Sequence, residues 1–189
     1  MLTLVTMVVQ FAMVFNGTAL ARYAAYNAAR AAAVYLPLNG NNGGNSTVQD
    51  KARMAAAVSL APIAPAGFGG LFGVSFPGLG GIPGLDFAGR VAYTYGILQM
   101  ANGIKIQKAA DFLSNSNSSN WQVREPVYVS LNYYFALMIP PAHQFMWEFA
   151  GSRRDGTSMA INALSGGQLK AVRMSAKAAF IYTGFDNVR

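Results

Sequence analysis

An apolar amino terminus constrains this chain more than any other feature, because no charged side chain occurs before Arg22. The first acidic residue is Asp50. The few polar side chains before Arg22 are Thr3, Thr6, Gln10, Asn16 and Thr18. A helix of about 20 residues, at about 1.5 Å per residue, matches the roughly 30 Å hydrocarbon core of a bilayer. The segment is therefore predicted to be a helix long enough to cross a membrane.

This segment lacks the marks of a secretory signal, which begins with a basic region and ends at a small-residue cleavage site. The apolar run instead starts at Met1 and continues into more helix-forming sequence. We therefore expect this segment to be part of the functional protein.

The sequence YAAYNAARAAAVY follows from Tyr23 to Tyr35, and the first proline is Pro37. Alanine is the strongest helix former, so one helix over residues 1–36, about 54 Å long, is expected. Its small residues recur every three or four positions at Ala21, Ala24, Ala25, Ala28, Ala31 and Ala32. Such a stripe lets neighbouring helices approach closely. We expect this stripe, together with Asn27 and the outward-facing Arg22 and Arg30, to form the surface through which copies assemble. In the alternative, the helix is a single membrane anchor and its alanines merely favour helix formation.

Residues 37–189 are predicted to form an outer α+β domain. Ser46 and Gln49 have capping-box spacing before a helix that Pro62 ends. The loop 62–86 is rich in glycine, proline and apolar residues, and we expect it to pack at a subunit interface, a flexible linker being the alternative. A further helix is expected from Phe87 to Leu113, with an interruption at Gly103 as the alternative.

Two segments alternate apolar residues with a period of two, which indicates β-strands. The first runs from Val127 to Ile139 and the second from Lys170 to Tyr182. We expect these two strands to pair antiparallel. The predicted fold class is therefore α+β: a long hydrophobic amino-terminal helix followed by a small globular domain with helices and an antiparallel sheet.

Composition argues against several classes of function. Only 11% of the residues are charged and 53% are hydrophobic, which favours association with lipid or with further copies. The net charge of +7 is spread along the chain, and its longest basic cluster is Arg153-Arg154, so no nucleic-acid partner is expected. The chain has no cysteine, which excludes disulfides and thiolate sites.

The sequence offers little for catalysis. His143, Glu148 and Asp155 are the best constellation, but their spacing fits no metal motif, and HExxH and GxSxG patterns are absent. We expect no enzyme activity, no cofactor and no metal. Asn45 and Asn117 begin Asn-X-Ser/Thr triplets, so each is a possible glycosylation site.

The unbroken apolar helix, its alanine-rich continuation and the later segment EPVYVSLNYYFALMIP together resemble the TadE-like pilins of tight-adherence pili, within the type IV filament superfamily. The segment Asn27-Ala28-Ala29-Arg30 is similar to that family's pattern after the membrane helix. Val5 occupies the position where type IV pilins usually carry glutamate, and Gln10 is a candidate hydrogen-bonding residue in its place.

This resemblance implies a precursor in the inner membrane that the pilus-assembly machinery extracts into an extracellular filament. The expected partners are further copies of the chain, with other pilins as additional candidates. The leading hypothesis is a structural filament subunit for adhesion. The alternative is a single membrane-anchored binding or pilus-assembly protein that does not polymerise. An anchored hydrolase that uses His143 and Glu148 is the third.

Overall fold

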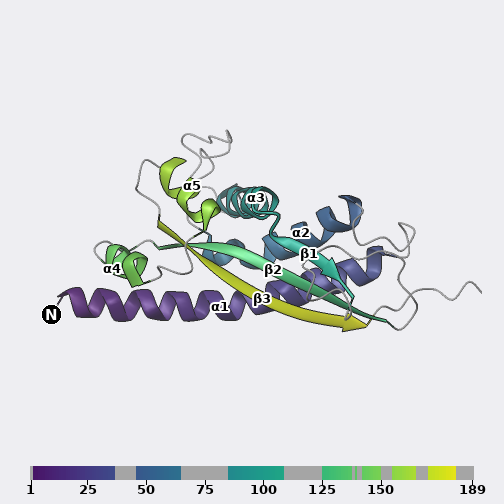
Figure 1. The fold of residues 1–189 in the computed structure, drawn as a ribbon, viewed down its shortest axis with the longest axis horizontal. Helices are drawn as coiled ribbons and strands as arrows, with labels where there is room; N and C mark the ends of the chain where they lie inside the picture. Colours follow the sequence, from purple (N-terminus) through teal and green to yellow (C-terminus); the bar gives the residue numbers. More distant parts are fainter. Residues whose placement is uncertain are drawn as a thin grey trace, which may run out of the picture.

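A computed structural model describes residues 2–36, 46–64, 85–108, 125–137, 139, 142–149, 155–164 and 170–181. Its elements are α1 (Leu2–Tyr35), α2 (Ser46–Leu60), η2 (Ala61–Ile63), α3 (Leu85–Met100), β1 (Ile104–Gln107), β2 (Pro126–Leu137), α4 (Ala142–Phe149), α5 (Gly156–Leu164) and β3 (Lys170–Ile181). The predicted α+β class, with a long apolar helix at the amino terminus, is confirmed (Figure 1).

The strands form an antiparallel sheet in the order β1-β2-β3. Leu131 of β2 lies between Ile104 of β1 and Ala176 of β3. The expected pairing of the two long strands is therefore confirmed. Their alternating apolar residues supply much of the core, because successive side chains in a strand point to opposite faces.

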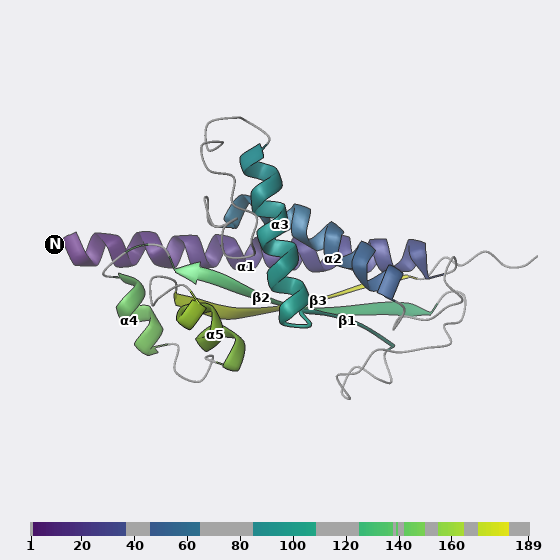
Figure 2. The ribbon, with the colours of Figure 1, turned by 90° about the horizontal axis from the view of Figure 1, so that it is seen from above.

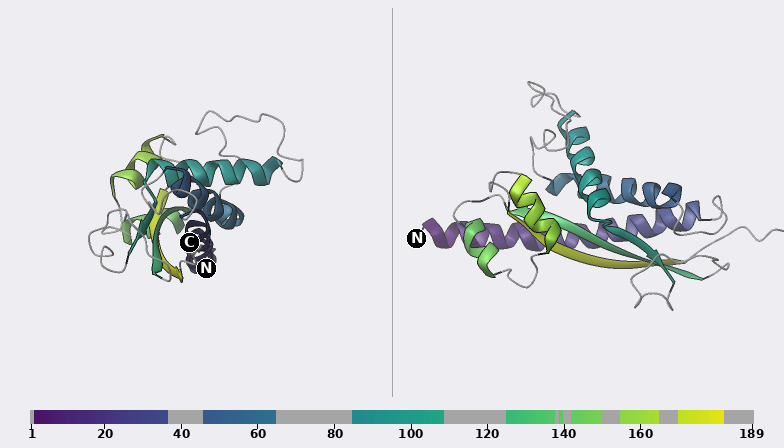
Figure 3. Two further views of the ribbon diagram at one scale, coloured as in Figure 1. Left: turned by 90° about the vertical axis from the view of Figure 1, so that its right-hand side faces the viewer. Right: turned by 45° about the horizontal axis from the view of Figure 1, so that its top comes forward.

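The helices cover both faces of this sheet. Helices α1 and α2 lie side by side, and α1 packs along β2 and β3 (Figures 1 and 2). Phe135 of β2 contacts α1 at Gly17, whereas the next residue back, Tyr134, bonds to Asp155 at the start of α5. Adjacent strand residues face opposite ways, so α1 and α5 lie on opposite faces of the sheet (Figure 3).

The helix predicted from Phe87 to Leu113 is wrong beyond Met100, because a turn and strand β1 follow. Asn102 has a left-handed φ of 46°, and the Gly103 amide donates to the Leu98 carbonyl at 2.8 Å, which closes the helix. A Cβ at Gly103 would lie 2.6 Å from the Asn132 carbonyl oxygen. The interruption expected at Gly103 is real, and it is the point where the chain enters the sheet.

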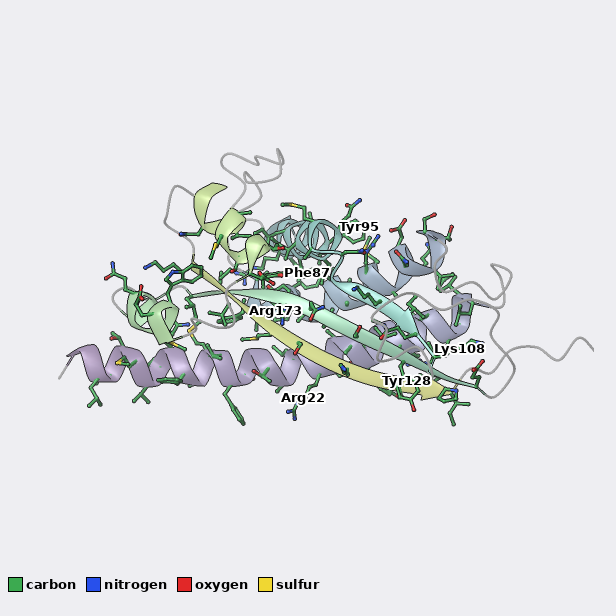
Figure 4. All side chains as sticks on the ribbon, viewed as in Figure 1. Arg22, Phe87, Tyr95, Lys108, Tyr128 and Arg173 are labelled. Atoms are coloured by element: carbon green, nitrogen blue, oxygen red, sulfur yellow. The ribbon has the colours of Figure 1, made fainter. Side chains whose placement is uncertain are left out.

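The helix predicted after Ser46 is α2, which includes Ser46 itself, and the Gln49 side chain of the expected capping box bonds elsewhere. The Gln49 Oε1 atom instead accepts a hydrogen bond from Arg53 Nη2 at 3.1 Å. Arg53 also pairs with Asp50 at 3.0 Å, and Asp50 accepts a bond from the Tyr95 hydroxyl at 3.2 Å. This network joins α2 to α3, and Tyr95 is labelled in Figure 4.

One hydrophobic core runs through α1, α2, α3 and the sheet. It includes the carboxyl half of α1, from Ala21 to Leu36. A division at residue 36 therefore does not separate two cores. Of the Gly/Pro-rich segment 62–86, residues 65–84 lie outside the described residues, so its interface role stays a prediction.

Candidate assembly surface on helix α1

Helix α1 has two different faces along its length. One face is buried against the rest of the chain at positions such as Gln10, Gly17, Ala21 and Ala28. The opposite face is exposed from Leu4 onward and carries large apolar side chains. A helix that is apolar all round needs a partner on each side, and the described residues supply one for only one side.

The exposed face contains a row of side chains that we call the ridge, consisting of Leu4, Val8, Phe11 and Phe15. Their spacing of four, three and four residues places them on one line along the helix. Phe15 is 80% exposed. Val5 and Val9 beside the ridge are also exposed. Contiguous exposed apolar groups of this kind mark contact surfaces for protein or membrane.

The alanine stripe does not form an exposed assembly surface, and this part of the prediction is wrong. Ala24, Ala25, Ala28 and Ala32 are fully buried, and Ala21 is 1% exposed. They face α2 and the sheet of the same chain. Small side chains allow close approach of any neighbouring element, and here that element comes from the same molecule.

Gly17 marks the closest approach of α1 to the sheet. A Cβ there would lie 3.2 Å from the Phe135 ring and 3.3 Å from the Met174 methyl group. The absence of a side chain therefore lets β2 and β3 reach the amino-terminal half of the helix. Sequence reasoning missed this residue, although a lone glycine inside a helical pattern is a recognised sign of close packing.

Gln10 is fully buried, whereas none of the residues from Leu4 to Val9 is buried. Its Oε1 atom accepts a hydrogen bond from the backbone amide of Ile139 at 3.1 Å. Gln10, the candidate hydrogen-bonding residue in place of the missing glutamate, therefore forms its hydrogen bond within its own chain. Val5, by contrast, is exposed.

The remaining predicted assembly residues keep some access to solvent. Arg22 and Arg30 are exposed, as predicted, and Arg22 points away from the sheet (Figure 4). Asn27 and Ala31 are half-buried. Asn27, Arg30 and Ala31 line a groove of about 510 Å³ between α1 and α2. The predicted site is thus divided: five alanines belong to the core, whereas Arg22 and the groove residues remain available.

Residues Leu4–Tyr35 form a helix that is long and apolar enough to cross a membrane, judged by length and composition. It lies near the amino terminus, so it fits a membrane anchor or a signal sequence. Most residues in the most apolar stretch of this helix are not buried within the chain.

Of the residues considered for catalysis, two lie on α4 and the third begins α5. Asp155 caps α5, with its Oδ1 accepting the Ser158 amide at 3.0 Å and its Oδ2 accepting the Tyr134 hydroxyl at 2.5 Å. Partial burial raises the pKa of Asp155, but the Tyr134, Ser158 and Arg173 bonds outweigh it and hold the pKa below its usual value. His143 and Glu148 both lie on α4. Within the described parts of the chain, no three His, Asp or Glu side chains gather as a metal site would require.

Asn45 and Asn117, the possible glycosylation sites, lie outside the described residues. No protein-family model, curated protein or solved structure matches the chain.

Proposed function

We propose that this chain is the structural subunit of an extracellular filament, similar to a TadE-like pilin, and that it polymerises through the exposed face of α1. The ridge from Leu4 to Phe15 carries this proposal. It places large apolar side chains on a helix whose other face is already packed on the chain's own sheet. Covering each such side chain removes it from water and contributes about 1.5 to 3 kcal/mol when burial is complete.

The docked position of the sheet favours a filament over a simple anchor. Residues 2–9, which precede the fully buried Gln10, span only about 12 Å at the rise of an α-helix. That is less than half of the roughly 30 Å hydrocarbon core. Helix α4 and the ends of β2 and β3 lie beside the next turns of α1 (Figure 1).

A perpendicular membrane span in this arrangement would draw those elements into lipid. Lys170 at the start of β3 pairs with Leu137 at the end of β2, and Gln144 and Glu148 on α4 are exposed. Charged side chains in hydrocarbon are costly. Copies of α1 would cover the ridge without that cost, and a membrane-bound precursor would have to release the sheet from α1 first.

The single-anchor alternative rests on the length and composition of α1. A single anchor would require the rest of the chain to stay clear of the bilayer. The described contacts instead attach the rest of the chain to α1 as far as Gln10. For this reason the filament is the better supported function.

Electron microscopy of shear-released surface material from cells that express the chain tests the proposal, with mass spectrometry to identify the subunit and its amino terminus. Filaments composed of this chain are the expected result. Phe11→Asp and Phe15→Asp should each abolish them, because a carboxylate would enter an apolar contact.

The matched control is Met159→Asp on α5, since Met159 and Phe11 are both 56% exposed. Filaments should survive this substitution. A wild-type chain that stays in the membrane fraction and yields no filament under any growth condition would overturn the proposal in favour of the single anchor.

A further inference from the structure

The groove between α1 and α2 is an apolar depression at the opposite end of α1 from the ridge. Val34 of α1 and Met54 and Val58 of α2 line it, and each is about half exposed. Ala31 and Ala55 also line the groove. The groove thus combines exposed apolar walls with small side chains that permit close approach of a helix.

Several polar side chains that line the groove already interact with groups of the same chain. The Asn27 amide donates to the Ser59 hydroxyl at 2.8 Å, and that hydroxyl donates to the Ala55 carbonyl at 2.9 Å. Lys51 lies over the Tyr35 ring, 5.6 Å from its centre. Since these groups already have partners within the chain, the groove favours an apolar occupant over a polar ligand.

The ridge of another copy has the shape and chemistry of such an occupant. Its side chains at Leu4, Val8, Phe11 and Phe15 project in one line, and the helix carries no charge before Arg22. Knobs at this spacing pack between the side chains of facing helices. The Arg30 and Lys51 side chains at the rim have long stems that can lie along an apolar partner while the charges stay in water.

A bilayer is a poorer explanation for these two surfaces. Leu4 and Val34 are separated by about 45 Å along the helix, at 1.5 Å per residue. The hydrocarbon core is only about 30 Å thick. Lipid around the ridge would therefore leave the groove uncovered when the helix crosses the membrane, whereas a second copy covers both surfaces at once.

We infer that the groove between α1 and α2 receives the ridge of α1 from a second copy of this chain. This inference rests on the proposed filament and names the contact that builds it. The two surfaces are different and lie at opposite ends of one helix, so the contact is head-to-tail. Contacts of that type extend into open filaments when the rotation between copies does not close a ring.

Disulfide crosslinking tests the contact directly, because the chain has no cysteine of its own. Val58→Cys in the groove is combined, one at a time, with Leu4→Cys or Val8→Cys on the ridge. Oxidised filaments from at least one pair should give a ladder of linked multimers on a denaturing gel. Detergent-dissolved monomer should give none, since both ends of a bond would then have to come from one chain. If the Val58→Cys variants do not assemble, Met54→Cys is used as the groove position instead.

The control pairs Val8→Cys with Met159→Cys on α5, away from the groove, and should give no ladder. Filaments that form normally but give no ladder from any groove pair would overturn this contact while leaving the filament proposal standing. Phospholipid retained in equal molar amount with the subunit, again without a ladder, would assign the groove to lipid and overturn the inference. Failure of the wild-type chain to form filaments would overturn both proposals.

Discussion

The two halves of α1 use apolar residues in opposite ways. From Leu4 to Phe15 the helix presents large side chains that stay exposed, whereas from Ala21 to Ala33 its alanines are mostly buried in the chain's own core. Arg22 lies near the junction on the outer face. The sequences of both halves favour an α-helix, so helix propensity does not distinguish them.

This difference shows that side-chain size decides which elements meet. Alanines allow α2 and the sheet to lie close to α1, and the single glycine at position 17 extends that contact toward the amino terminus. Large side chains on the outer face keep neighbouring elements at a distance and leave surface for another molecule. A small-residue stripe therefore predicts a close contact, but not whether the partner belongs to the same chain.

Enlarging the buried alanines should give the largest loss of stability. Ala24→Leu with Ala28→Leu forces extra methylene groups into a filled core, which costs about 1 to 3 kcal/mol for each substitution. The melting temperature of the body, followed by circular dichroism, should fall by about 5 to 20 °C at the usual 2 to 4 °C per kcal/mol for a chain of this size.

The matched control for that pair is Ala12→Leu with Ala19→Leu, because both alanines lie on the exposed face of the same helix. This control should melt within a few degrees of the wild type. A core pair as stable as the control pair would mean that the carboxyl half of α1 is not packed against α2 and the sheet.

Gly17→Leu should have the next largest effect, because the new side chain would collide with Phe135 and Met174. We expect a loss of about 1 to 3 kcal/mol in the free energy of unfolding. Asn16→Leu, one residue away on the exposed face, is the control and should change stability little. Equal unfolding midpoints in denaturant for the two variants would show that the sheet does not reach this turn of α1.

Removing the Asp155 carboxylate should cost less and should not involve α1. Asp155→Ala removes the cap of α5, worth about 1 kcal/mol. Since the folded pKa lies below the usual value of about 3.9, the stabilisation is complete above that value and is lost as the pH falls through the folded pKa. Denaturant unfolding between pH 7 and pH 3 should show the two proteins converging in acid, and a constant gap between them would contradict the assignment.

Phe15→Ser should have the smallest effect on folding. The side chain is 80% exposed, and surface substitutions usually change stability by no more than about 0.5 kcal/mol. Its melting temperature should match that of the wild type while filament yield falls sharply. A Phe15→Ser chain that melts much earlier would place this residue in the core of the single chain instead of at a contact between copies.

Local periodicity was sufficient to predict several elements. The proline-free apolar stretch predicted α1, and the alternation at Val127 to Ile139 and at Lys170 to Tyr182 predicted β2, β3 and their antiparallel pairing. These signals are strong because each extends over many residues. Strand β1 was missed since its four residues are too few to show a period against the preceding helix.

Only part of the candidate site could be predicted from the sequence. The uncharged amino terminus indicated a surface that needs a partner, and Arg22 and Arg30 were correctly placed on the outer face. Nothing local indicated that α2 would cover one side of the alanine stripe, that Phe135 would meet Gly17, or that Met54 and Val58 would join Val34 in a groove.

Sequence alone therefore determined that α1 is long, apolar and helical, because those properties depend on neighbours along the chain. Only the tertiary structure decided which face of α1 is already occupied. The residues that occupy it come from far away along the chain, as Gln10 and Ile139 illustrate, since they are 129 positions apart. A helix that is apolar on all sides carries no periodic signal that selects one side, so the choice is made by the packing of the sheet and α2 against the small residues.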